Sequence, residues 1–555
     1  MVVELALDPA DDQARAQDVY ARELGRVRAS LGLAAHVDLI VRAHHGGVVL
    51  GYEAPIDVML ACAEMSEWAA LSAIDVLGSG EPHALEPKRT EIEGALAAEA
   101  NPRLLALAEE AARRSVPLLW DESVVSLGTG RHSLSFPSSA LPDVTGVPWA
   151  EVGTVPIALV TGTNGKTTSS RLLARVAKEA GLCAGIASTD GILIGSATVE
   201  HGDWTGPGAA RIVLRGAEVD LAVLETARGG ILRRGLAVDT CDVALITNVS
   251  DDHLGLCGID DVAAMARVKL VVAQAVTATG TAVLNANDPN LVSLARELPC
   301  NVTFFADLEG PPGVALEAAR AVIAAHRALG KRVVVAERGA IVSAKGPERG
   351  GDTATVARVE AVPITFGGAA RYNVENVLGV VAAAEALGLP EVAIRRALHG
   401  FGMRDNPGRG QVIERNGVTV VLDFGHNPEG VRAVMTLIAS LREGRGRLTV
   451  VTGSPGDRTN DEIEGVVRTI CESRPDRVFV RELTDYVRGR EPGEVPALFA
   501  RAFRAQGLPE EAFTIAASEV DALQRAFADA VPGDFIAVLV HLDKEPVEAF
   551  LASSA

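Results

Sequence analysis

The clearest chemical signal in the sequence is a glycine-rich loop that ends in lysine and threonine. It follows an apolar run over residues 155–160 and precedes a helical pattern. Glycines let the backbone close around a phosphate, and the N-terminus of the next helix favours the anion. Lys166 would then reach the β- and γ-phosphates, and Thr167 would contact Mg²⁺. The loop consists of Gly162, Thr163, Asn164, Gly165, Lys166, Thr167 and Thr168.

This loop departs from the general GxxxxGK[ST] form, because Val160 stands where the first glycine would be. A glycine-rich turn that only caps a helix is the alternative interpretation. The order of strand, loop, Lys-Thr and helix favours phosphate binding.

Polar residues also follow two further strand-like runs. Glu225 comes after residues 221–224, and Asn248 comes after residues 244–247 and is soon followed by Asp252 and His253. In a parallel sheet these strand ends face one crevice. A carboxylate and an imidazole there can complete a divalent-metal site beside a triphosphate. Taken singly, each residue has a simpler interpretation: Glu225 as an ordinary charged residue of a helix or loop, and His253 as an ordinary turn residue.

Lys269 stands in the apolar segment ARVKLVV, sixteen residues after His253 in the chain. That position predicts a lysine near a buried boundary. On position alone, the simplest interpretation is a lysine whose stem is covered while its ammonium reaches water.

The elements that must position these residues are alternating strands and helices. From residue 155 short β-rich runs alternate with helical patterns, and a second such series begins after Phe401. The alternation predicts an α/β protein: a doubly wound parallel sheet with a phosphate-binding loop over 155–405, then a Rossmann-like domain over 406–555. Before them we expect a small α+β domain over 1–133 and a Ser/Pro/Gly-rich linker over 134–154. In the first domain we expect strands at 37–41 and 47–51 and helices at 55–74 and 91–115.

The composition of the chain limits the partners and the cellular location that we expect. The chain has 555 residues and a formal net charge of −20, which argues against a nucleic-acid backbone as the main partner. The N-terminal apolar run is too short for a signal peptide, and no run reaches the ~20 residues of a membrane span. The six cysteines form no CxxC pair. We therefore expect a cytoplasmic protein without a membrane or nucleic-acid partner.

Together the motifs resemble the Mur ligase superfamily, and within it the cyanophycin synthetase group. The resemblance covers about residues 155–555, and more weakly 1–133. That group carries an ATP-grasp domain between these two parts, whereas this sequence has only the linker there. The motifs that carry the resemblance are GTNGKTT, STDGILI, GDWTGP, ETARGGILRRGL, TNVSDDHLG, ARVK, LNANDP, RYNVEN, NPGR, DFGHNP, GSPGDR, VRGREPGEVP and HLDKEPV.

The resemblance implies a role for each matching residue. ATP and two Mg²⁺ ions are implied, with Thr167 and Glu225 on one ion and His253 with Glu225 on the other. Lys269 matches the lysine that is carbamylated in many Mur ligases, and a carbamate is an oxygen ligand. With Lys166, these form the implied catalytic set. Further nucleotide contacts are implied for Asn285, Asp288, Arg409, Asp423 and His426, and substrate contacts for Thr189, Asp190, Asp203, Thr205 and Arg228.

The implied activity is an ATP-dependent carboxylate–amine ligase of the EC 6.3.2 type that acts through an acyl-phosphate and releases ADP and phosphate. Its substrate would be an amino acid, a peptide or a polymer, and a homo-oligomer is implied. Two alternatives stay open. One is another Mur-type ligase, for peptidoglycan or folate polyglutamate. The other is a non-catalytic subunit that serves a separate ATP-grasp protein.

Overall fold

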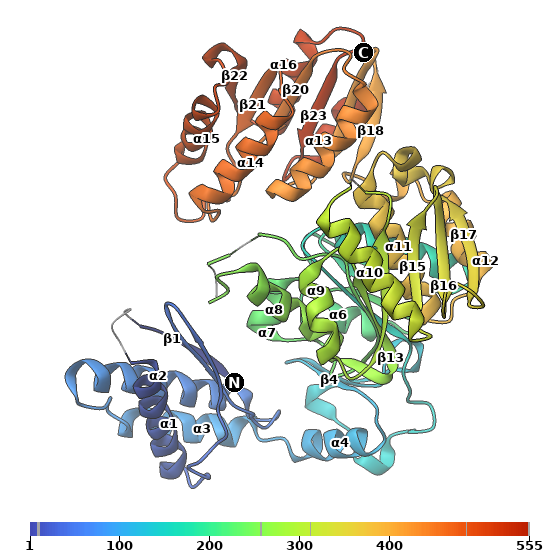
Figure 1. Ribbon diagram of the computed structural model, residues 1–555. Coiled ribbons are helices and arrows are strands. Elements are labelled where there is room, and N and C mark those ends of the chain that lie inside the picture. Colours follow the sequence, from blue (N-terminus) through green and yellow to red (C-terminus); the bar gives the residue numbers. More distant parts are fainter. Residues whose placement is uncertain (8–11, 253, 256–257, 311, 484–485, 553–555) are drawn as a thin grey trace. The chain divides into compact units, whose positions relative to one another are not determined.

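The computed structural model describes residues 1–555 except 8–11, 253, 256–257, 311, 484–485 and 553–555. The contacts of the chain define two compact units (Figure 1). One unit is Met1–Thr154 with Gly255–Asp261, and the other is Val155–Leu254 with Val262–Ala555. The predicted α/β class, with a small α+β part ahead of two α/β domains, is confirmed.

The N-terminal unit packs helices against a three-stranded sheet of order β1-β3-β2. Tyr20 and Trp68, one from each of the two longest helices of this unit, are buried in its core. A second small sheet has the order β4-β5-β6. The elements are β1 (Val2–Ala6), α1 (Gln13–Ser30), β2 (Ile40–His44), β3 (Gly47–Gly51), α2 (Met59–Ser79), α3 (Glu86–Glu99), α4 (Pro102–Arg113), β4 (Leu118–Trp120), β5 (Val124–Leu127) and β6 (Leu134–Pro137).

Two sequence expectations differ from this unit. The single helix expected over 91–115 is two helices, because the Asn101 side chain accepts the Leu104 N–H and Pro102 begins α4. The segment 134–154, expected as a linker, holds strand β6 paired with β5. Leu141 and Val147 of that segment are buried in the same core as α4. Apolar residues at wide spacing give no periodic signal, which explains why the segment reads as a linker.

The first domain of the second unit is built on an eleven-stranded sheet of order β10-β9-β8-β11-β7-β12-β13-β14-β15-β16-β17. Neighbouring strands from β8 to β15 run parallel, and the strands at both edges pair antiparallel. The strands are β7 (Ile157–Thr161), β8 (Ala184–Ser188), β9 (Gly191–Ile194), β10 (Ala197–His201), β11 (Leu221–Glu225), β12 (Cys241–Ile246), β13 (Val276–Asn285), β14 (Asn301–Asp307), β15 (Arg332–Glu337), β16 (Ala340–Lys345) and β17 (Asp352–Arg358).

Helices cover this sheet because its central strands are apolar on both faces. The first helix after β7 packs against β8 and β11, and the helix that starts at Arg371 packs across β12 to β15. The helices of this domain are α5 (Lys166–Glu179), α6 (Pro207–Leu214), α7 (Arg228–Arg234), α8 (Val262–Gln274), α9 (Pro289–Leu294), α10 (Val314–Ala328), α11 (Arg371–Ala386) and α12 (Glu391–Gly400).

The C-terminal domain has a six-stranded sheet of order β18-β19-β23-β20-β21-β22, parallel except for β18. Its core holds a buried ion pair, Arg481 with Glu519. The elements are β18 (Gln411–Arg415), β19 (Val418–Asp423), α13 (Pro428–Arg442), β20 (Leu448–Thr452), α14 (Asn460–Glu472), β21 (Arg477–Arg481), α15 (Glu494–Ala505), β22 (Phe513–Ala516), α16 (Glu519–Asp529), β23 (Phe535–Leu539) and α17 (Lys544–Ala552).

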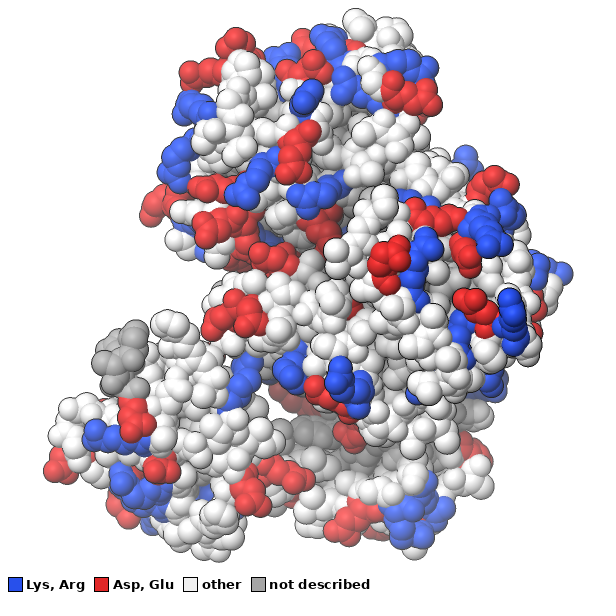
Figure 2. Space-filling model, in the orientation of Figure 1, with Lys and Arg blue, Asp and Glu red and all other residues white. Residues whose placement is uncertain are grey.

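Acidic and basic side chains are interspersed over the face drawn in Figure 2, where no broad basic surface gathers among the described residues. That face offers no extended track for a phosphate backbone. Over the part of the chain that the structure describes, none of the helices combines the length and the apolar character that crossing a membrane requires.

Candidate functional site

Three strand ends of the large sheet meet at the glycine-rich loop. Strand β7, which leads into the loop, lies between β11 and β12. Glu225 at the end of β11 pairs in register with Val160, and Ile246 at the end of β12 pairs with Thr161. All three strands run in the same direction, so their carboxyl ends open on one crevice, as the sequence predicts.

The loop has the backbone shape of a phosphate cradle. Gly162 and Gly165 have φ angles of +152° and +85°. A Cβ at Gly162 would lie 1.9 Å from Thr247 Oγ1, and one at Gly165 would lie 2.0 Å from Asn376 Oδ1. Glycine is therefore required at both positions. Helix α5 begins at Lys166, whose ammonium donates to the carbonyls of Gly162 and Thr163 at 3.1 and 3.0 Å. This places a cation and a helix N-terminus at the cradle.

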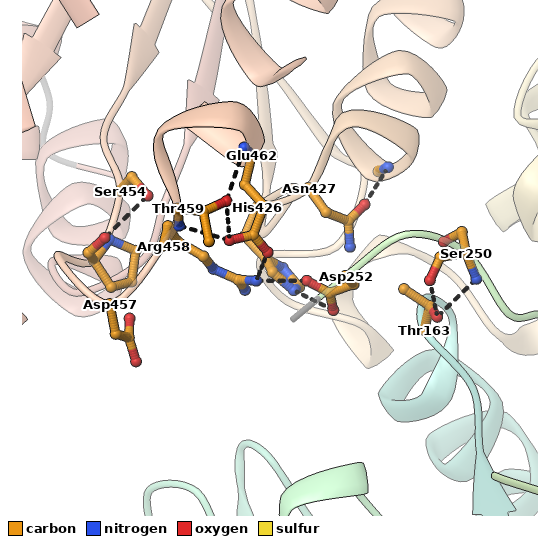
Figure 3. Close-up of polar contacts among 12 residues, drawn as sticks. Thr163, Ser250, Asp252, His426, Asn427, Ser454, Asp457, Arg458, Thr459 and Glu462 are labelled. Atoms are coloured by element: carbon orange, nitrogen blue, oxygen red, sulfur yellow. Dashed lines mark hydrogen bonds and ion pairs between the residues drawn. The ribbon is translucent and has the colours of Figure 1, made fainter. Parts of the chain in front are cut away.

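The segment after β12 holds the loop in this shape. The backbone N–H of Asn164 donates to Asn248 Oδ1 at 2.9 Å, and Thr247 Oγ1 donates to the Asn164 carbonyl at 2.6 Å. Ser250 N–H donates to Thr163 Oγ1 at 3.0 Å (Figure 3). Asn248, noted in the sequence only as a strand-end residue, thus fixes the loop.

Glu225 and Thr167 are in direct contact under the loop. Thr167 Oγ1 donates to Glu225 Oε2 at 3.0 Å, and Thr189 Oγ1 donates to Glu225 Oε1 at 2.8 Å. Glu225 is only 2% exposed. A buried carboxylate and a hydroxyl side by side are hard-oxygen donors of the kind that Mg²⁺ prefers.

Lys269 is buried in α8, with 4% of the residue exposed. Burial first, and then the positive charge of Lys166, lower the pKa of its ammonium to about 7. Asp252 acts in the opposite direction, whereas Arg228 at the start of α7 also lowers the pKa. The lysine is therefore enclosed, in contrast to the partly exposed lysine that position alone suggests. His253, the expected imidazole ligand, lies outside the described residues.

The C-terminal domain touches the loop directly. Asn427, which caps α13, donates through Nδ2 to Asn164 Oδ1 at 3.1 Å. Asn406 donates through Nδ2 to Thr168 Oγ1 at 3.1 Å. The sequence motif predicts Asn164 and Thr168 as loop residues. It does not predict their hydrogen bonds to the C-terminal domain.

A cavity of about 500 Å³ lies between the loop and the C-terminal domain. Arg409 and Asp423 line it, and the guanidinium of Arg409 lies 4.4 Å from the ring centroid of Phe424. Burial raises the pKa of Asp423 to about 6, although Arg409 and the N–H groups of Gly410 and Gly425 oppose the shift. His426, also expected at the nucleotide, lines the same cavity.

Asn285 bonds a residue that lines this cavity, whereas Asp288 caps a helix. Asn285 Nδ2 donates to Glu375 Oε2 at 2.9 Å, and Glu375 lines the cavity. Burial raises the pKa of Glu375 to about 7. Asp288 caps α9 through Asn290 and accepts the Val249 N–H at 2.6 Å. Neither Asn285 nor Asp288 is among the described residues that line the cavity. Sequence reasoning missed Glu375, which stands between the two asparagines of RYNVEN.

The expected substrate residues lie in three places, and one of them, Arg228, is at the start of α7 where it acts on Lys269. Thr189 lines the cavity, and the next residue, Asp190, forms an ion pair with Arg171 at 2.8 Å. Asp203 and Thr205 form a turn of their own, in which Thr205 Oγ1 donates to Asp203 Oδ1 at 2.9 Å. That geometry is ordinary for a loop.

A buried arginine also joins the two domains, through the segment that follows β12. Arg458 of the GSPGDR motif is 6% exposed and donates to Asp252 Oδ1 at 2.6 Å and to Glu462 Oε1 at 3.1 Å. Figure 3 shows its guanidinium between the two carboxylates, with His426 beside Asp252. Glu462 and Thr459 form a capping box that fixes the start of α14.

The residues present fit a magnesium nucleotide. The cradle admits only glycine at two positions, Lys166 supplies a cation, and Thr167 with Glu225 supplies oxygen donors. No group of three His, Cys, Asp or Glu side chains gathers as a metal cluster within the described ranges. Phosphate oxygens and the residues beside Glu225 would complete the coordination of an ion there. The fold and the site thus define an ATP-binding α/β protein of two cooperating domains.

Comparison with known proteins gives the family. Residues 160–384 match the Mur ligase middle domain, and residues 408–539 match the domain described as "Mur ligase, glutamate ligase domain". The two matches together cover more than half of the chain. The chain belongs to the Mur ligase family and is an ATP-dependent acid–amino-acid ligase of that family.

The matches with individual relatives cover part of this chain and part of each relative. Cyanophycin synthetase of Synechocystis sp. (strain ATCC 27184 / PCC 6803 / Kazusa) is 37% identical over 399 residues, 70% of this chain and 44% of that protein. UDP-N-acetylmuramate–L-alanine ligase of Polaromonas sp. (strain JS666 / ATCC BAA-500) is 29% identical over 68% of this chain and 72% of that protein. The chain thus spans less than half the length of the cyanophycin synthetase.

Among solved structures, the ligand-free bifunctional folylpolyglutamate synthase/dihydrofolate synthase from Yersinia pestis c092 superposes with a TM-score of 0.52. The two chains are 22% identical, and the match covers 71% of this chain and 90% of that one. At this identity the likeness bears on the fold alone.

Replacement of Arg458 tests the interdomain contact. Arg458→Met leaves the largely buried Asp252 and Glu462 without this partner, so we expect the free energy of unfolding to fall by about 3 kcal/mol. Urea denaturation measures the change. Arg468→Met, which alters an exposed arginine of α14, the helix that follows Arg458, is the control and should be nearly neutral. Equal stability of the two variants would contradict the contact.

Proposed function

We propose that this chain joins a carboxylate to the amine of an amino acid or peptide through an acyl-phosphate, with one nucleotide site between the middle and C-terminal domains. The observation that carries the proposal is the contact of Thr167 with the buried Glu225, directly beneath the phosphate cradle. Two oxygen donors and a lysine there are what a phosphoryl transfer needs at its anionic centre.

The chemistry proceeds in two steps. A carboxylate oxygen of the acid substrate attacks the terminal phosphorus of ATP, and the bond from that phosphorus to the ADP oxygen breaks. The amine then attacks the carbonyl carbon of the acyl-phosphate, and phosphate leaves as the amine loses a proton. Lys166 neutralises charge on the transferring group, while Thr167 and Glu225 would hold Mg²⁺, which supplies further charge stabilisation when bound.

The domain contacts give a reason why water does not consume the acyl-phosphate. Asn427 and Asn406 bond the C-terminal domain to the loop, and the cavity is lined from both domains. A site closed in this way excludes water before the chemistry begins. Arg409 and Asp423 are proposed as the nucleotide contacts of the C-terminal domain, and Asn285 is proposed to act through Glu375.

The sequence identity to the cyanophycin synthetases supports substrates related to theirs, an acid and an amine, for this chain. We propose that this chain has a single nucleotide site. The chain spans 42–44% of two of those proteins, so their whole activity is not carried over. We further propose that the protein is a homo-oligomer. A separate ATP-grasp protein is proposed as a candidate partner, because the resemblance implies an ATP-grasp domain and this sequence has residues 134–154 in its place.

Replacement of Lys166 tests the phosphoryl transfer. Lys166→Ala removes the cation at the cradle, so we expect ADP release to fall by about 10³-fold or more with any acid–amine pair that stimulates the wild type. Steady-state ADP release across amino acids and short peptides measures this. Lys178→Ala removes an exposed lysine from the end of the same helix and serves as the control. Unchanged turnover in folded Lys166→Ala protein would end the mechanism.

We propose that Lys269 is carbamylated and thereby becomes an oxygen ligand beside Glu225. Its enclosure and its lowered pKa make the neutral amine available near neutral pH. The amine nitrogen attacks CO₂, a carbamate forms and one proton is lost. The negative product offsets the positive charges of Lys166 and Arg228, which now disfavour the ammonium.

Carbon-13 NMR after exchange into ¹³C-bicarbonate tests this modification. We expect a carbamate resonance in the wild type that is lost in Lys269→Ala and kept in Lys178→Ala. The same spectrum in the wild type and in Lys269→Ala would exclude the modification at this lysine.

A further inference from the structure

The motif VRGREPGEVP, at residues 487–496, has so far been given no role. It lies in the C-terminal domain between β21 and α15 and contacts the loop at 453–458 that follows β20. The Gly456 N–H donates to the Tyr486 carbonyl at 2.8 Å, and a Cβ at Gly456 would lie 1.8 Å from the Val487 carbonyl oxygen. The two backbones therefore approach so closely that only glycine fits. We call residues 453–458 the Arg458 loop.

Arg490 of this motif holds the Arg458 loop through several hydrogen bonds. Its Nε donates to the Gly456 carbonyl at 2.8 Å, and its Nη2 donates to the Arg458 carbonyl at 2.8 Å and to Asn460 Oδ1 at 2.9 Å. Its Nη1 donates to Glu494 Oε1 at 2.7 Å, and its side chain is 17% exposed. The Arg458 loop contains two glycines, which restrict its backbone little, so these charge-assisted bonds fix its course.

The course of this loop matters because its last residue reaches the middle domain. Arg458 is 6% exposed, and its Nη1 donates to Asp252 Oδ1 at 2.6 Å (Figure 3). Asp252 follows Asn248 and Ser250, which both bond the phosphate loop. Asp252 Oδ2 also lies 3.7 Å from Nε2 of His426, which lines the nucleotide cavity. The position of the Arg458 backbone thus decides whether the C-terminal domain engages the segment that shapes the phosphate cradle.

The contacts of Arg490 stay within its own domain. All four of its acceptors belong to the C-terminal domain, whereas Asp252 belongs to the middle domain. An influence of Arg490 on Asp252 therefore passes through Arg458, which contacts both. A residue that only stabilised the C-terminal domain would have no such influence. The coupling between Arg490 and Asp252 distinguishes the two roles.

We propose that Arg490 is a positioning residue for the ligation. It fixes the Arg458 loop so that Arg458 reaches Asp252 and the C-terminal domain is held on the segment beside the phosphate loop. It acts through Arg458 and is not itself a catalytic residue. The effect on turnover rests on the proposed function, whereas the coupling of Arg490 to Asp252 does not.

Replacement of Arg490 in the full chain tests its role in turnover. Arg490→Met removes the donors to the loop, so we expect kcat/KM for ADP release to fall about 10- to 100-fold, the effect of losing hydrogen bonds from a charged group. Arg490→Lys, which keeps the charge, should recover part of the loss. Arg488→Met is the matched control, because Arg488 of the same motif is half-exposed and forms only a surface ion pair with Asp457. Equal kcat/KM in Arg490→Met and Arg488→Met would overturn the proposal.

A double-mutant cycle tests whether the effect passes through Arg458. Asp252→Asn weakens the same interdomain contact from the middle domain. The double variant Arg490→Met/Asp252→Asn should therefore lose clearly less kcat/KM than the product of the two single losses, because both changes impair one contact. Arg488→Met/Asp252→Asn should lose the full product. A full product for the Arg490 double variant as well would mean that Arg490 only stabilises its own domain, and the proposal would fail.

The same cycle measured by urea denaturation separates this proposal from the ligase function. Denaturation needs no substrate, so it decides the coupling even if the wild type releases no ADP with any pair, in which case only the ligase function fails. We expect Asp252→Asn to lower the urea midpoint of the wild type and to lower that of Arg490→Met by less. Arg490→Lys takes the place of Arg490→Met in the cycle should the methionine variant not fold. An equal shift in both backgrounds, or no shift in the wild type, overturns the proposal.

Discussion

The structure depends on one constraint: three parallel strands must end together around the phosphate loop. β11 delivers Glu225, β7 delivers the loop, and β12 delivers the segment whose Asn248 holds the loop in shape. If the register of β11 slipped by one residue, Glu225 would point to the other face and lose Thr167. The apolar strands therefore do more than form a core, because their register places the oxygen donors that the chemistry needs.

The phosphate loop and the cavity beside it also depend on the C-terminal domain. Asn427 and Asn406 form hydrogen bonds with the loop. Arg458 donates a hydrogen bond to Asp252, in the segment that follows β12. A ligase that makes a hydrolysable acyl-phosphate benefits from such a closed arrangement, since water is excluded where the acyl group is activated. Interdomain polar contacts can also be remade at each turnover, unlike a large apolar interface.

Much of this could be predicted from the sequence, because the signals are local. The loop, the strand ends at Glu225 and Asn248, and the alternation of strands and helices follow from glycine spacing and apolar periodicity. The ion pairs Arg458–Asp252 and Arg171–Asp190 could not, since charge patterns do not reveal which distant side chains meet. Asp288 matched a motif, yet it caps α9. The break at Asn101 between α3 and α4 was missed, although Pro102 directly after Asn101 is a typical sign of a helix start.

The central claim is that one magnesium nucleotide is bound beneath these strand ends. A crystal structure with Mn²⁺ and a non-hydrolysable ATP analogue tests it most directly, because anomalous scattering locates the metal. The account predicts phosphates on the N–H groups of the Gly162–Thr167 loop and a metal within coordination distance of Thr167 Oγ1 and the Glu225 carboxylate. A nucleotide bound elsewhere, or a metal remote from Glu225, would contradict it.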